Sequence, residues 1–336
     1  MQRSTIALAR AVSLLFFAVV VGCGGTTSTA PKPLSVHGVF STPLDEPWTA
    51  AVHAALLAAQ QAGEITYDWD ASIGTTGSME PALRHVLSEK PPDIFVGDAF
   101  GDEDAVRRVA ADYPKIAFVF GSGLGPTPPN LSVFDDWIHE PAYLCGMLAG
   151  GLTASNKIAV VAAVPQPEVN RLVNAFVAGA KEVNPHARVA VAFIGEWYDP
   201  PAARSAAQAA IAGGADVIYA ERDGAIEAAA AAGVWAFGNI LDQSAVAPDV
   251  VVSSAVWNMT PTVEYVIQAV REGWYTPEDL REHSMLSAGG AAMAPFGAME
   301  SQLPAQLVEM VRGREQQIKA GEFRVPIDET PPGAVN

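Results

Sequence analysis

Short runs of valine, isoleucine and phenylalanine alternate with longer, alanine-rich stretches over most of this chain. The short runs have the length and composition of buried strands, and the longer stretches repeat apolar residues at helical spacing. The predicted strands are Leu34–Val39, Ile65–Trp69, Asp93–Val96, Ile116–Phe120, Lys157–Ala162, Val189–Ile194, Asp216–Tyr219, Val234–Phe237 and Val250–Ala255. The predicted helices lie near 47–62, 78–89, 102–112, 138–152, 168–183, 200–213, 223–232, 259–272 and 303–320. Such alternation indicates βαβ units and parallel sheets.

A faint internal repeat suggests two similar sheets in tandem. Residues 92–95 and residues 215–218 each open a strand that is followed by a helix and another strand. Two α/β lobes with a cleft between them fit this pattern and the length of the chain. Ligands of open parallel sheets bind beyond the carboxyl ends of the strands. The residues that follow each predicted strand are therefore the candidates for ligand contact.

The first 22 residues have the layout of a secretory signal peptide. Arg3 and Arg10 lie before an uncharged apolar run at 11–21. This run is too short to span a bilayer as a mature helix. Cys23 follows directly, as in a bacterial lipobox, so we expect cleavage before it and lipidation of its thiol. Residues 23–33 then form a flexible tether.

The remaining cysteine and the charge narrow the class of protein further. Cys145 lies alone in an apolar predicted helix and is expected to act as a small core residue. The net charge of −17 becomes −19 when the two arginines of the signal peptide are removed. A charge of this sign argues against nucleic acid or anionic lipid as a partner.

Sequence signatures of catalysis, metal binding and cofactor binding are absent. The six histidines do not have metal-ligand spacing, and no nucleophile or nucleotide-binding motif is found. The glycine-rich run 121–125 leads into prolines instead of a helix, which favours a surface crossover over a phosphate loop. The end of the chain, 324–336, contains three prolines and is predicted to be a loose terminus.

Aromatic, carboxylate and amide side chains gather after the predicted strands. A flat ring beside carboxylates is a natural receptor for a flat heterocycle with N–H donors. For each tryptophan the alternative is lobe packing, and for each acid it is a helix N-cap, which we prefer for Asp199 because Pro200 follows. The candidate ligand-binding residues are Trp48, Asp98, Trp197, Glu221, Asn239, Asp242, Trp257 and Asn258.

Four segments together resemble a known family. They are 140–146 (EPAYLCG), 197–200 (WYDP), 214–218 (GADVI) and 254–258 (SAVWN), which occur in order within a similarity that runs from about 34 to 325. This sequence is similar to the basic membrane protein family, the purine-nucleoside-receptor-like lipoproteins that serve ABC importers.

The resemblance implies a type I periplasmic-binding-protein fold with hinge crossings near 135, 254 and 287. The N-terminal lobe would comprise 34–135 and 255–286, the C-terminal lobe 136–254 and 287–325, and residues 326–336 a tail. Family members stack a purine on an aromatic of the first loop, which matches Trp48, and hold its polar side with a carboxylate, which matches Asp242. The implied partners are the permease and ATPase subunits of an importer, and the implied location is extracytoplasmic, on a membrane.

The first loop, Asp45–Thr49, departs from the nucleoside receptors of the family, and the lysine expected near Trp257 is absent. These departures favour a free base or a related heterocycle over a nucleoside. The same fold could instead bind a sugar or another small polar metabolite, or serve as a ligand-sensing receptor. An enzyme of nucleoside metabolism is less favoured, because no acid–base or nucleophile pair is found.

The lipid anchor can be tested by labelling. Cys23→Ser should abolish incorporation of a lipid label, because only a thiol forms the diacylglyceryl thioether. Cys145→Ser should leave labelling intact. Labelling of the Cys23→Ser protein at the wild-type level would contradict the assignment.

Overall fold

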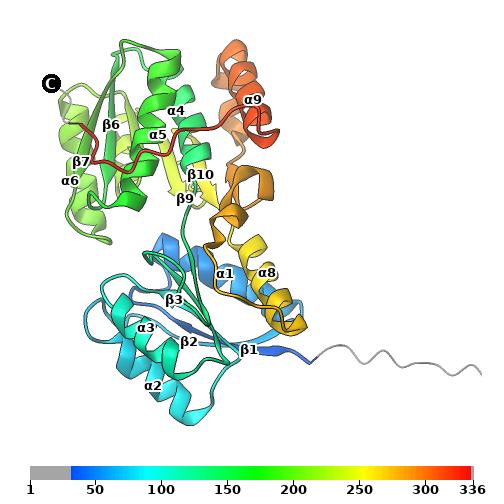
Figure 1. The fold of residues 1–336 in the computed structure, drawn as a ribbon. Helices are drawn as coiled ribbons and strands as arrows, with labels where there is room; N and C mark the ends of the chain where they lie inside the picture. The colour runs from blue at the N-terminus through cyan, green and yellow to red at the C-terminus, as the bar shows by residue number, and fades with distance from the viewer. Residues whose placement is uncertain (1–31, 334–336) are drawn as a thin grey trace, which may run out of the picture. The chain divides into compact units, whose positions relative to one another are not determined.

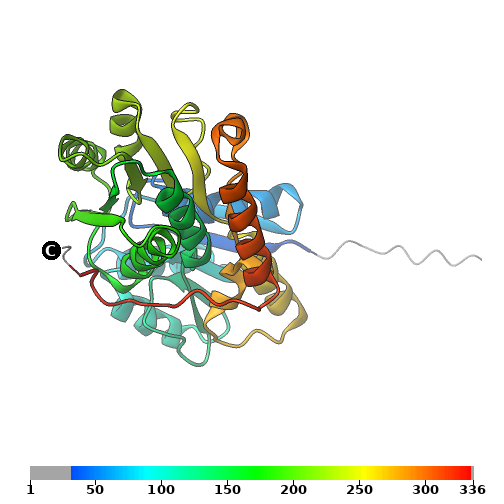
Figure 2. The same cartoon turned by 90° about the horizontal axis from the view of Figure 1, so that it is seen from above.

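The computed structural model describes residues 32–333, which form two α/β lobes (Figures 1 and 2). Each lobe is built on its own sheet, with helices on both faces. The predicted fold class is therefore confirmed. The signal peptide, Cys23 and most of the tether lie outside the described residues. No helix within the described part of the chain is both long and apolar enough to cross a membrane.

The N-terminal lobe contains a five-stranded parallel sheet in the order β2-β1-β3-β4-β5. Its strands are β1 (Leu34–Val39), β2 (Ile65–Asp70), β3 (Ile94–Asp98), β4 (Ala117–Gly121) and β5 (Leu131–Phe134). Its helices are α1 (Pro47–Gln61), α2 (Met79–Glu89), α3 (Glu103–Asp112) and α8 (Thr260–Glu272). Helix α8 comes from much later in the chain and packs beside α1, while α2 and α3 pack together on the opposite face (Figure 1).

The C-terminal lobe contains a six-stranded sheet in the order β11-β10-β9-β8-β6-β7, parallel except for β11. Its strands are β6 (Lys157–Ala162), β7 (Arg188–Phe193), β8 (Val217–Ala220), β9 (Trp235–Ile240), β10 (Val251–Trp257) and β11 (Ala291–Met293). Its helices are α4 (His139–Leu152), α5 (Pro167–Val183), α6 (Pro200–Ala212), α7 (Ala225–Ala232) and α9 (Ala305–Lys319).

The strands are apolar on both faces because helices cover both. In β4, Ala117 and Val119 face the core that includes α1 and α8, whereas Phe118 and Phe120 face α2 and α3. Side chains of successive strand residues point to opposite faces, so continuous apolar runs suit such a sheet. Cys145 of α4 is fully buried, as predicted, and burial raises the pKa of its thiol to about 12.

Every predicted strand and helix is present, with ends shifted by a few residues. Two short strands were not predicted, β5 and β11, together with the 3-10 helices Leu280–Ser284, Leu286–Ala288 and Gly297–Gln302. The prediction that the terminus is loose is wrong for residues 328–330, which are held on α5. Asn170 and Asn174 of α5 donate side-chain hydrogen bonds to backbone carbonyls of Glu329, Asp328 and Thr330, at 2.9–3.0 Å.

Three crossings join the lobes, after β5, after β10 and after the 3-10 helix Leu280–Ser284. Strand β10 stays in the C-terminal sheet to Trp257, which pairs with Ala291 of β11, so the second crossing follows at 258–259 and not near 254. One residue of each crossing region enters a single chain of hydrogen bonds. Trp257 Nε1 donates to Ser284 Oγ at 3.2 Å, and Ser284 Oγ donates to the backbone oxygen of Asp135 at 3.1 Å. The crossings therefore form one connected hinge.

The lobes also touch away from the hinge, through a buried arginine. Arg222, just after β8, donates through Nε and Nη2 to both carboxylate oxygens of Glu221, at 2.9 and 2.5 Å. Its Nη1 lies 3.4 Å from Glu46 Oε1 of the N-terminal lobe. Burial alone would lower the pKa of Arg222, but the charges of Glu221 and Glu46 raise it. Arg222 is thus a cation shared between the two lobes.

An aromatic contact lies beside this ion pair. Phe100 of the N-terminal lobe meets the ring of Trp197 edge to face, with centroids 4.9 Å apart and an interplanar angle of 76°. The guanidinium of Arg222 lies 5.7 Å from the same ring and donates to the backbone oxygen of Trp197 at 3.1 Å. Phe100, Trp197, Arg222 and Glu46 therefore form a continuous contact between the lobes.

Removing the shared cation should destabilise the fold strongly. Arg222→Gln should lower the free energy of unfolding by about 3–5 kcal/mol, because it leaves buried carboxylates without a counter-charge. Arg271→Gln, which breaks a partly exposed pair with Glu64 in the N-terminal lobe, should cost far less. Urea denaturation of both variants measures the difference.

The deficit of the Arg222→Gln protein should depend on pH. Burial raises the pKa of Glu46 and the charge of Arg222 opposes that rise, so removing Arg222 raises the pKa further. A carboxyl whose pKa is higher in the folded than in the unfolded state disfavours folding when ionised. The deficit should therefore be larger at pH 8 than at pH 5. An equal loss of unfolding free energy in the Arg222→Gln and Arg271→Gln proteins would contradict the role of Arg222 as a shared cation. A loss in the Arg222→Gln protein that does not change with pH would also contradict it.

Candidate ligand-binding site

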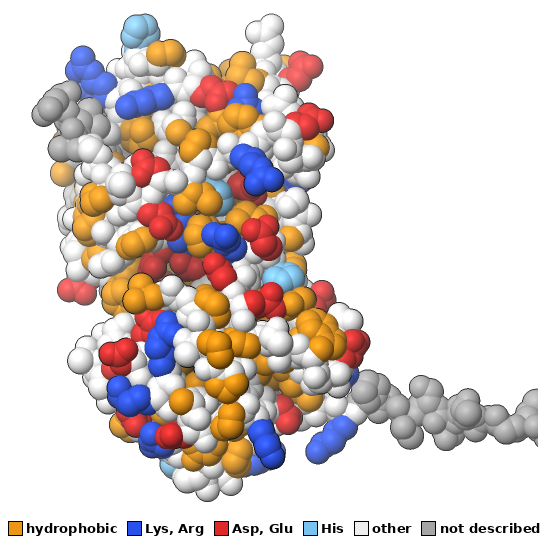
Figure 3. Space-filling model, in the orientation of Figure 1, with side chains coloured by type: hydrophobic (Ala, Val, Ile, Leu, Met, Phe, Trp, Pro, Cys, Tyr) orange, Lys and Arg blue, Asp and Glu red, His pale blue; other side chains and the backbone are white. Residues whose placement is uncertain are grey.

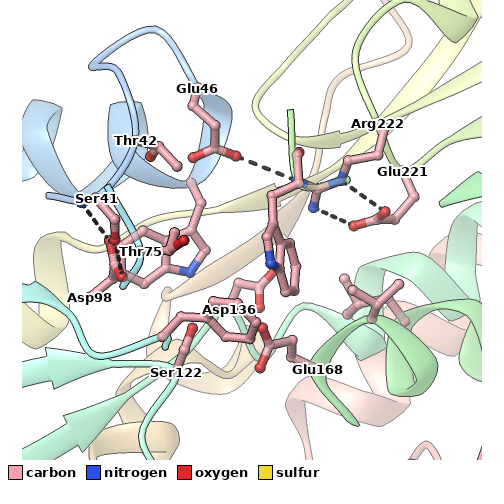
Figure 4. A pocket seen from close by; sticks show the side chains of 15 residues that line it. Ser41, Thr42, Glu46, Thr75, Asp98, Ser122, Asp136, Glu168, Glu221 and Arg222 are labelled. Carbon is pink, nitrogen blue, oxygen red and sulfur yellow. Dashed lines mark hydrogen bonds and ion pairs between the residues drawn. The ribbon is translucent and has the colours of Figure 1, made fainter. Parts of the chain in front are cut away.

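A cavity lies between the lobes at the carboxyl ends of the strands (Figure 4). It holds about 570 Å³ of space free of protein atoms, including the part that opens to solvent. Asp and Glu side chains gather in the hollow between the lobes (Figure 3). The residues that line the cavity are Ser41, Thr42, Glu46, Trp48, Thr75, Asp98, Phe100, Ser122, Asp136, Glu168, Val169, Leu172, Trp197, Glu221 and Arg222.

The first turn of α1 positions Trp48. Pro47 begins the helix, and Glu46 caps it by accepting a hydrogen bond from the backbone N–H of Thr49 at 3.0 Å. The Trp48 ring stacks on Phe134 with centroids 5.5 Å apart and an interplanar angle of 13°. Its indole N–H is buried and has no hydrogen-bond partner within residues 32–333. This N–H is a donor that a bound molecule could satisfy.

A glycine makes room for that ring. A Cβ atom at Gly121, the last residue of β4, would lie 2.2 Å from the Trp48 ring. Ser122 follows and lines the cavity, while Leu124 in the same glycine-rich run is 95% exposed. The prediction of a surface crossover is thus correct for the exposed tip and wrong for Gly121 and Ser122, which belong to the site.

Asp98 ends β3 and is held by the loop after β1. Its carboxylate accepts hydrogen bonds from the backbone N–H of Ser41, at 3.0 Å, and from the Ser41 hydroxyl, at 2.5 Å. Burial raises the pKa of Asp98, and the hydrogen bonds from Ser41 oppose that rise. The side chain is thereby fixed as an acceptor at the floor of the N-terminal lobe.

Asp136 and Glu168 form a second acidic region, at the hinge side of the cavity. Figure 4 shows their carboxyl groups close together, below the pair formed by Glu46 and Arg222. Burial raises the pKa of Glu168 to about 8, and the negative charge of Asp135 adds to the effect. Burial and Asp135 also raise the pKa of Asp136 well above its usual value.

Four of the eight predicted ligand-binding residues line the cavity. Trp48 and Asp98 do so from the N-terminal lobe, and Trp197 and Glu221 from the C-terminal lobe. These four lie at or just after the carboxyl ends of four different strands, so the rule that ligands bind beyond those ends led to residues of this cavity. Asp199 caps α6 through the backbone N–H of Ala202 at 3.0 Å, as predicted.

The other four lie outside the lining of this cavity. Asn239 is buried behind Glu221 and accepts a hydrogen bond from the Tyr219 hydroxyl at 2.7 Å. Asp242 is exposed and binds the backbone N–H of Ser244, two residues along its own loop. Local loop geometry, which the sequence pattern does not specify, turns its carboxylate away.

Trp257 and Asn258 belong to the hinge. Trp257 is buried behind Trp48, with ring centroids 5.4 Å apart, so it supports the cavity wall instead of lining it. Asn258 is exposed, donates to the backbone oxygen of Gly289 at 3.0 Å and accepts from the backbone N–H of Thr260. Both residues serve the second crossing in this structure.

Several lining residues were not predicted. Glu46 lies two residues before the predicted Trp48, and Arg222 directly follows the predicted Glu221. Asp136 and Glu168 had no comparable signal, because Asp136 follows an unpredicted strand and the segment before Glu168, 163–166, contains no aromatic or acidic residue. Within the described residues no group of three or more acidic, histidine or cysteine side chains could hold a metal ion.

Two sequence relatives are informative in view of this geometry. A Haloferax volcanii protein, whose name provisionally assigns it glucose binding in an ABC transporter, is 32% identical over 272 residues, covering 80% of this chain and 68% of the relative. A purine-binding protein of Brucella abortus is 30% identical over 254 residues, covering 75% of this chain and 70% of the relative.

A solved structure shares the fold. An ABC transporter solute-binding protein from Aeropyrum pernix superposes with a TM-score of 0.73 at 19% identity, covering 88% of this chain and 94% of that chain. The sequence model of a family described as ABC transporter substrate-binding protein PnrA-like matches residues 34–280. The two-lobed fold, the cavity between the lobes and these matches agree: the chain belongs to the PnrA-like (Bmp) family of ABC transporter substrate-binding proteins.

Proposed function

We propose that this protein is the extracytoplasmic, lipid-anchored receptor of an ABC importer and binds a purine base or nucleoside between its lobes. The observation that carries the proposal is the cavity itself. It presents the half-buried ring of Trp48 beside the carboxylates of Asp98, Asp136 and Glu168. A flat heterocycle with N–H donors matches both features.

Aromatic side chains line the cavity from both lobes. Trp48 is supported from behind by Phe134 and Trp257, so its orientation is fixed before a ligand arrives. Trp197 lines the cavity from the C-terminal lobe and contacts Phe100. Stacking of a nucleobase on an aromatic ring contributes about 1–3 kcal/mol. A ring that is already ordered loses little entropy when the ligand binds.

The family and one relative support a purine ligand. The family model describes PnrA-like receptors, and the Brucella abortus relative is named for purine binding. In the site, Trp48 occupies the first turn of α1, where the resemblance implies the stacking aromatic. The carboxylate implied by the resemblance was Asp242, and in our proposal Asp98, Asp136 and Glu168 take its part.

The ligand would be captured as the two lobes close about the hinge. We assign 34–135 with 258–286 to the N-terminal lobe and 136–257 with 287–325 to the C-terminal lobe, which moves the second boundary implied by the resemblance from 254 to 257. The contact between Glu46 and Arg222 joins the lobes at the cavity and is suited to hold the closed form. The closed receptor would then deliver its ligand to the permease, and the ATPase subunits would drive transport.

A sugar is the second candidate ligand. The Haloferax volcanii relative carries a provisional glucose-binding name, and tryptophan rings beside carboxylates also suit a pyranose. A ligand-sensing role would use the same cavity and the same closure. An enzyme of nucleoside metabolism is the least favoured alternative, and turnover of a nucleoside by the purified protein would support it.

A thermal-shift panel of purines, nucleosides, pyrimidines and sugars tests the proposal. A purine or nucleoside at 100 times its dissociation constant should stabilise the protein by about 2.7 kcal/mol. Trp48→Ala should weaken binding of that compound by about 1–3 kcal/mol, and Trp48→Phe should recover much of the loss.

Trp274→Ala is the matched control, because Trp274 is exposed and does not line the cavity. It should leave affinity unchanged. Affinities are compared in the folded fraction, since Trp48 also packs on Phe134. Stabilisation by sugars alone, or unchanged affinity in the Trp48→Ala protein, would contradict the proposal.

A further inference from the structure

The cavity contains more acidic than basic groups. Five carboxyl groups line it, those of Glu46, Asp98, Asp136, Glu168 and Glu221, against the single cation Arg222. Arg222 is already opposed by Glu221 and Glu46. Asp98 is satisfied by Ser41. The carboxyl groups of Asp136 and Glu168 therefore remain to be explained.

The nearest other cation is also engaged elsewhere. Arg171 of α5 binds Asp135 at 2.5 Å through Nη2 and Glu329 of the C-terminal segment at 3.1 Å through Nη1. Asp136 is a more distant partner, 3.5 Å from Nη2. Within residues 32–333, the Glu168 side chain has no hydrogen bond and no ion pair, and Arg171 and Arg222 act on its pKa only through their charges. Glu168 is thus an acceptor that faces the cavity without a partner.

Donors for an anionic ligand are scarce in the same cavity. Arg222 donates through Nε and Nη2 to Glu221, and through Nη1 to Glu46 and to the backbone oxygen of Trp197. The neutral donors that remain include the indole N–H of Trp48 and the hydroxyl groups of Thr75 and Ser122. A ligand carboxylate or phosphate would find no free cation in the lining, and its charge would oppose ionisation of the neighbouring carboxyl groups.

We infer that Glu168 and Asp136 form an acidic subsite that selects ligands with N–H donors or positive charge at that end and rejects anions. This inference rests on the proposed function, since it assumes that the cavity holds the ligand. It narrows the ligand class to amino-substituted or cationic ring compounds. The ligand would supply the counter-charge that the protein does not.

Glu168 has one other physical role to consider. It occupies the first turn of α5, where an acidic residue interacts favourably with the helix dipole. Glu227 occupies the first turn of α7, is exposed and lies outside the cavity lining. Glu227→Gln therefore provides a matched control for a helix effect. Loss of affinity in the Glu168→Gln protein alone would report on the subsite.

Ligand binding should be linked to proton release. The charged groups around Glu168 are Asp135 and Asp136 from the crossing, Arg171 from its own helix, and Glu221 and Arg222 after β8. With a pKa of about 8 in the free protein, Glu168 is largely protonated at pH 7. A donor-rich or cationic ligand favours the ionised form and lowers that pKa. Affinity should therefore rise as pH increases from 6 to 8, then level off.

The experiment uses isothermal titration calorimetry of the whole mature protein with two pairs of probes. The first pair is adenine, which carries an amino group, and urate, which is an anion at neutral pH. The second pair is glucosamine, which is cationic, and glucuronate, which is anionic. Wild type, Glu168→Gln, Asp136→Asn and Glu227→Gln are compared, and circular dichroism checks that each variant is folded.

We expect adenine to bind wild type and the Glu227→Gln protein equally and urate not to bind. Glu168→Gln should weaken adenine binding by about 10- to 100-fold and remove most of the pH dependence. Asp136→Asn should weaken adenine binding in the same direction, and its loss of affinity is a second, independent check. Adenine binding that is unaffected by Glu168→Gln or by pH would overturn the inference and leave the proposed function intact.

The glucosamine pair separates the two claims. Binding of glucosamine but not of adenine or other purines would contradict the proposed function and support the acidic subsite. Binding of urate or glucuronate by wild type at least as tight as that of its partner would overturn the subsite. If none of the four probes and no purine binds, both claims fail together.

Discussion

The cavity between the lobes buries several carboxylates with too few cations to neutralise them, and much of the structure responds to that constraint. Arg222 is shared by Glu221 and Glu46, which ties the C-terminal lobe to the first helix of the N-terminal lobe. The hydroxyl and the backbone N–H of Ser41 both donate hydrogen bonds to Asp98. Buried charge is tolerated only when it is paired, hydrogen-bonded or protonated. Glu168 has neither an ion-pair partner nor a hydrogen bond. Burial raises its pKa to about 8, which favours the protonated form.

The residues of the hinge lie directly beside those of the cavity, so in the proposed function recognition and closure are linked. Trp257 stands behind Trp48 and also donates to Ser284, which in turn binds the backbone of Asp135. The next residue, Asp136, lines the cavity. A ligand that contacts Trp48 and Asp136 would therefore touch groups that are held at two of the three crossings. In the proposed closure, no further residues are needed to connect ligand binding to the hinge, because the cavity lining packs directly on the hinge residues.

The fold could be predicted from sequence because both faces of each sheet are covered, so buried strands appear as continuous apolar runs such as Ile116–Phe120. The short strands β5 and β11 could not, since three or four residues carry too little pattern. Half of the predicted site residues line the cavity, because strand ends converge there. Asp242 and Asn239 do not, because the direction of a side chain depends on local loop geometry and on partners such as Tyr219. Glu168 lies in the first turn of α5 as Trp48 lies in that of α1, but the segment between β6 and α5 contains no aromatic or acidic residue that would have drawn attention to it.

Small-angle X-ray scattering of the mature protein with and without saturating adenine tests the central claim most directly. That claim is that a small heterocycle is captured by closure of two lobes around the cavity that Trp48, Asp98 and Glu168 line. The account predicts a smaller radius of gyration and a shorter maximum dimension in the presence of adenine. Identical scattering curves, at a concentration where calorimetry shows full occupancy, would contradict it and indicate a rigid, preformed site.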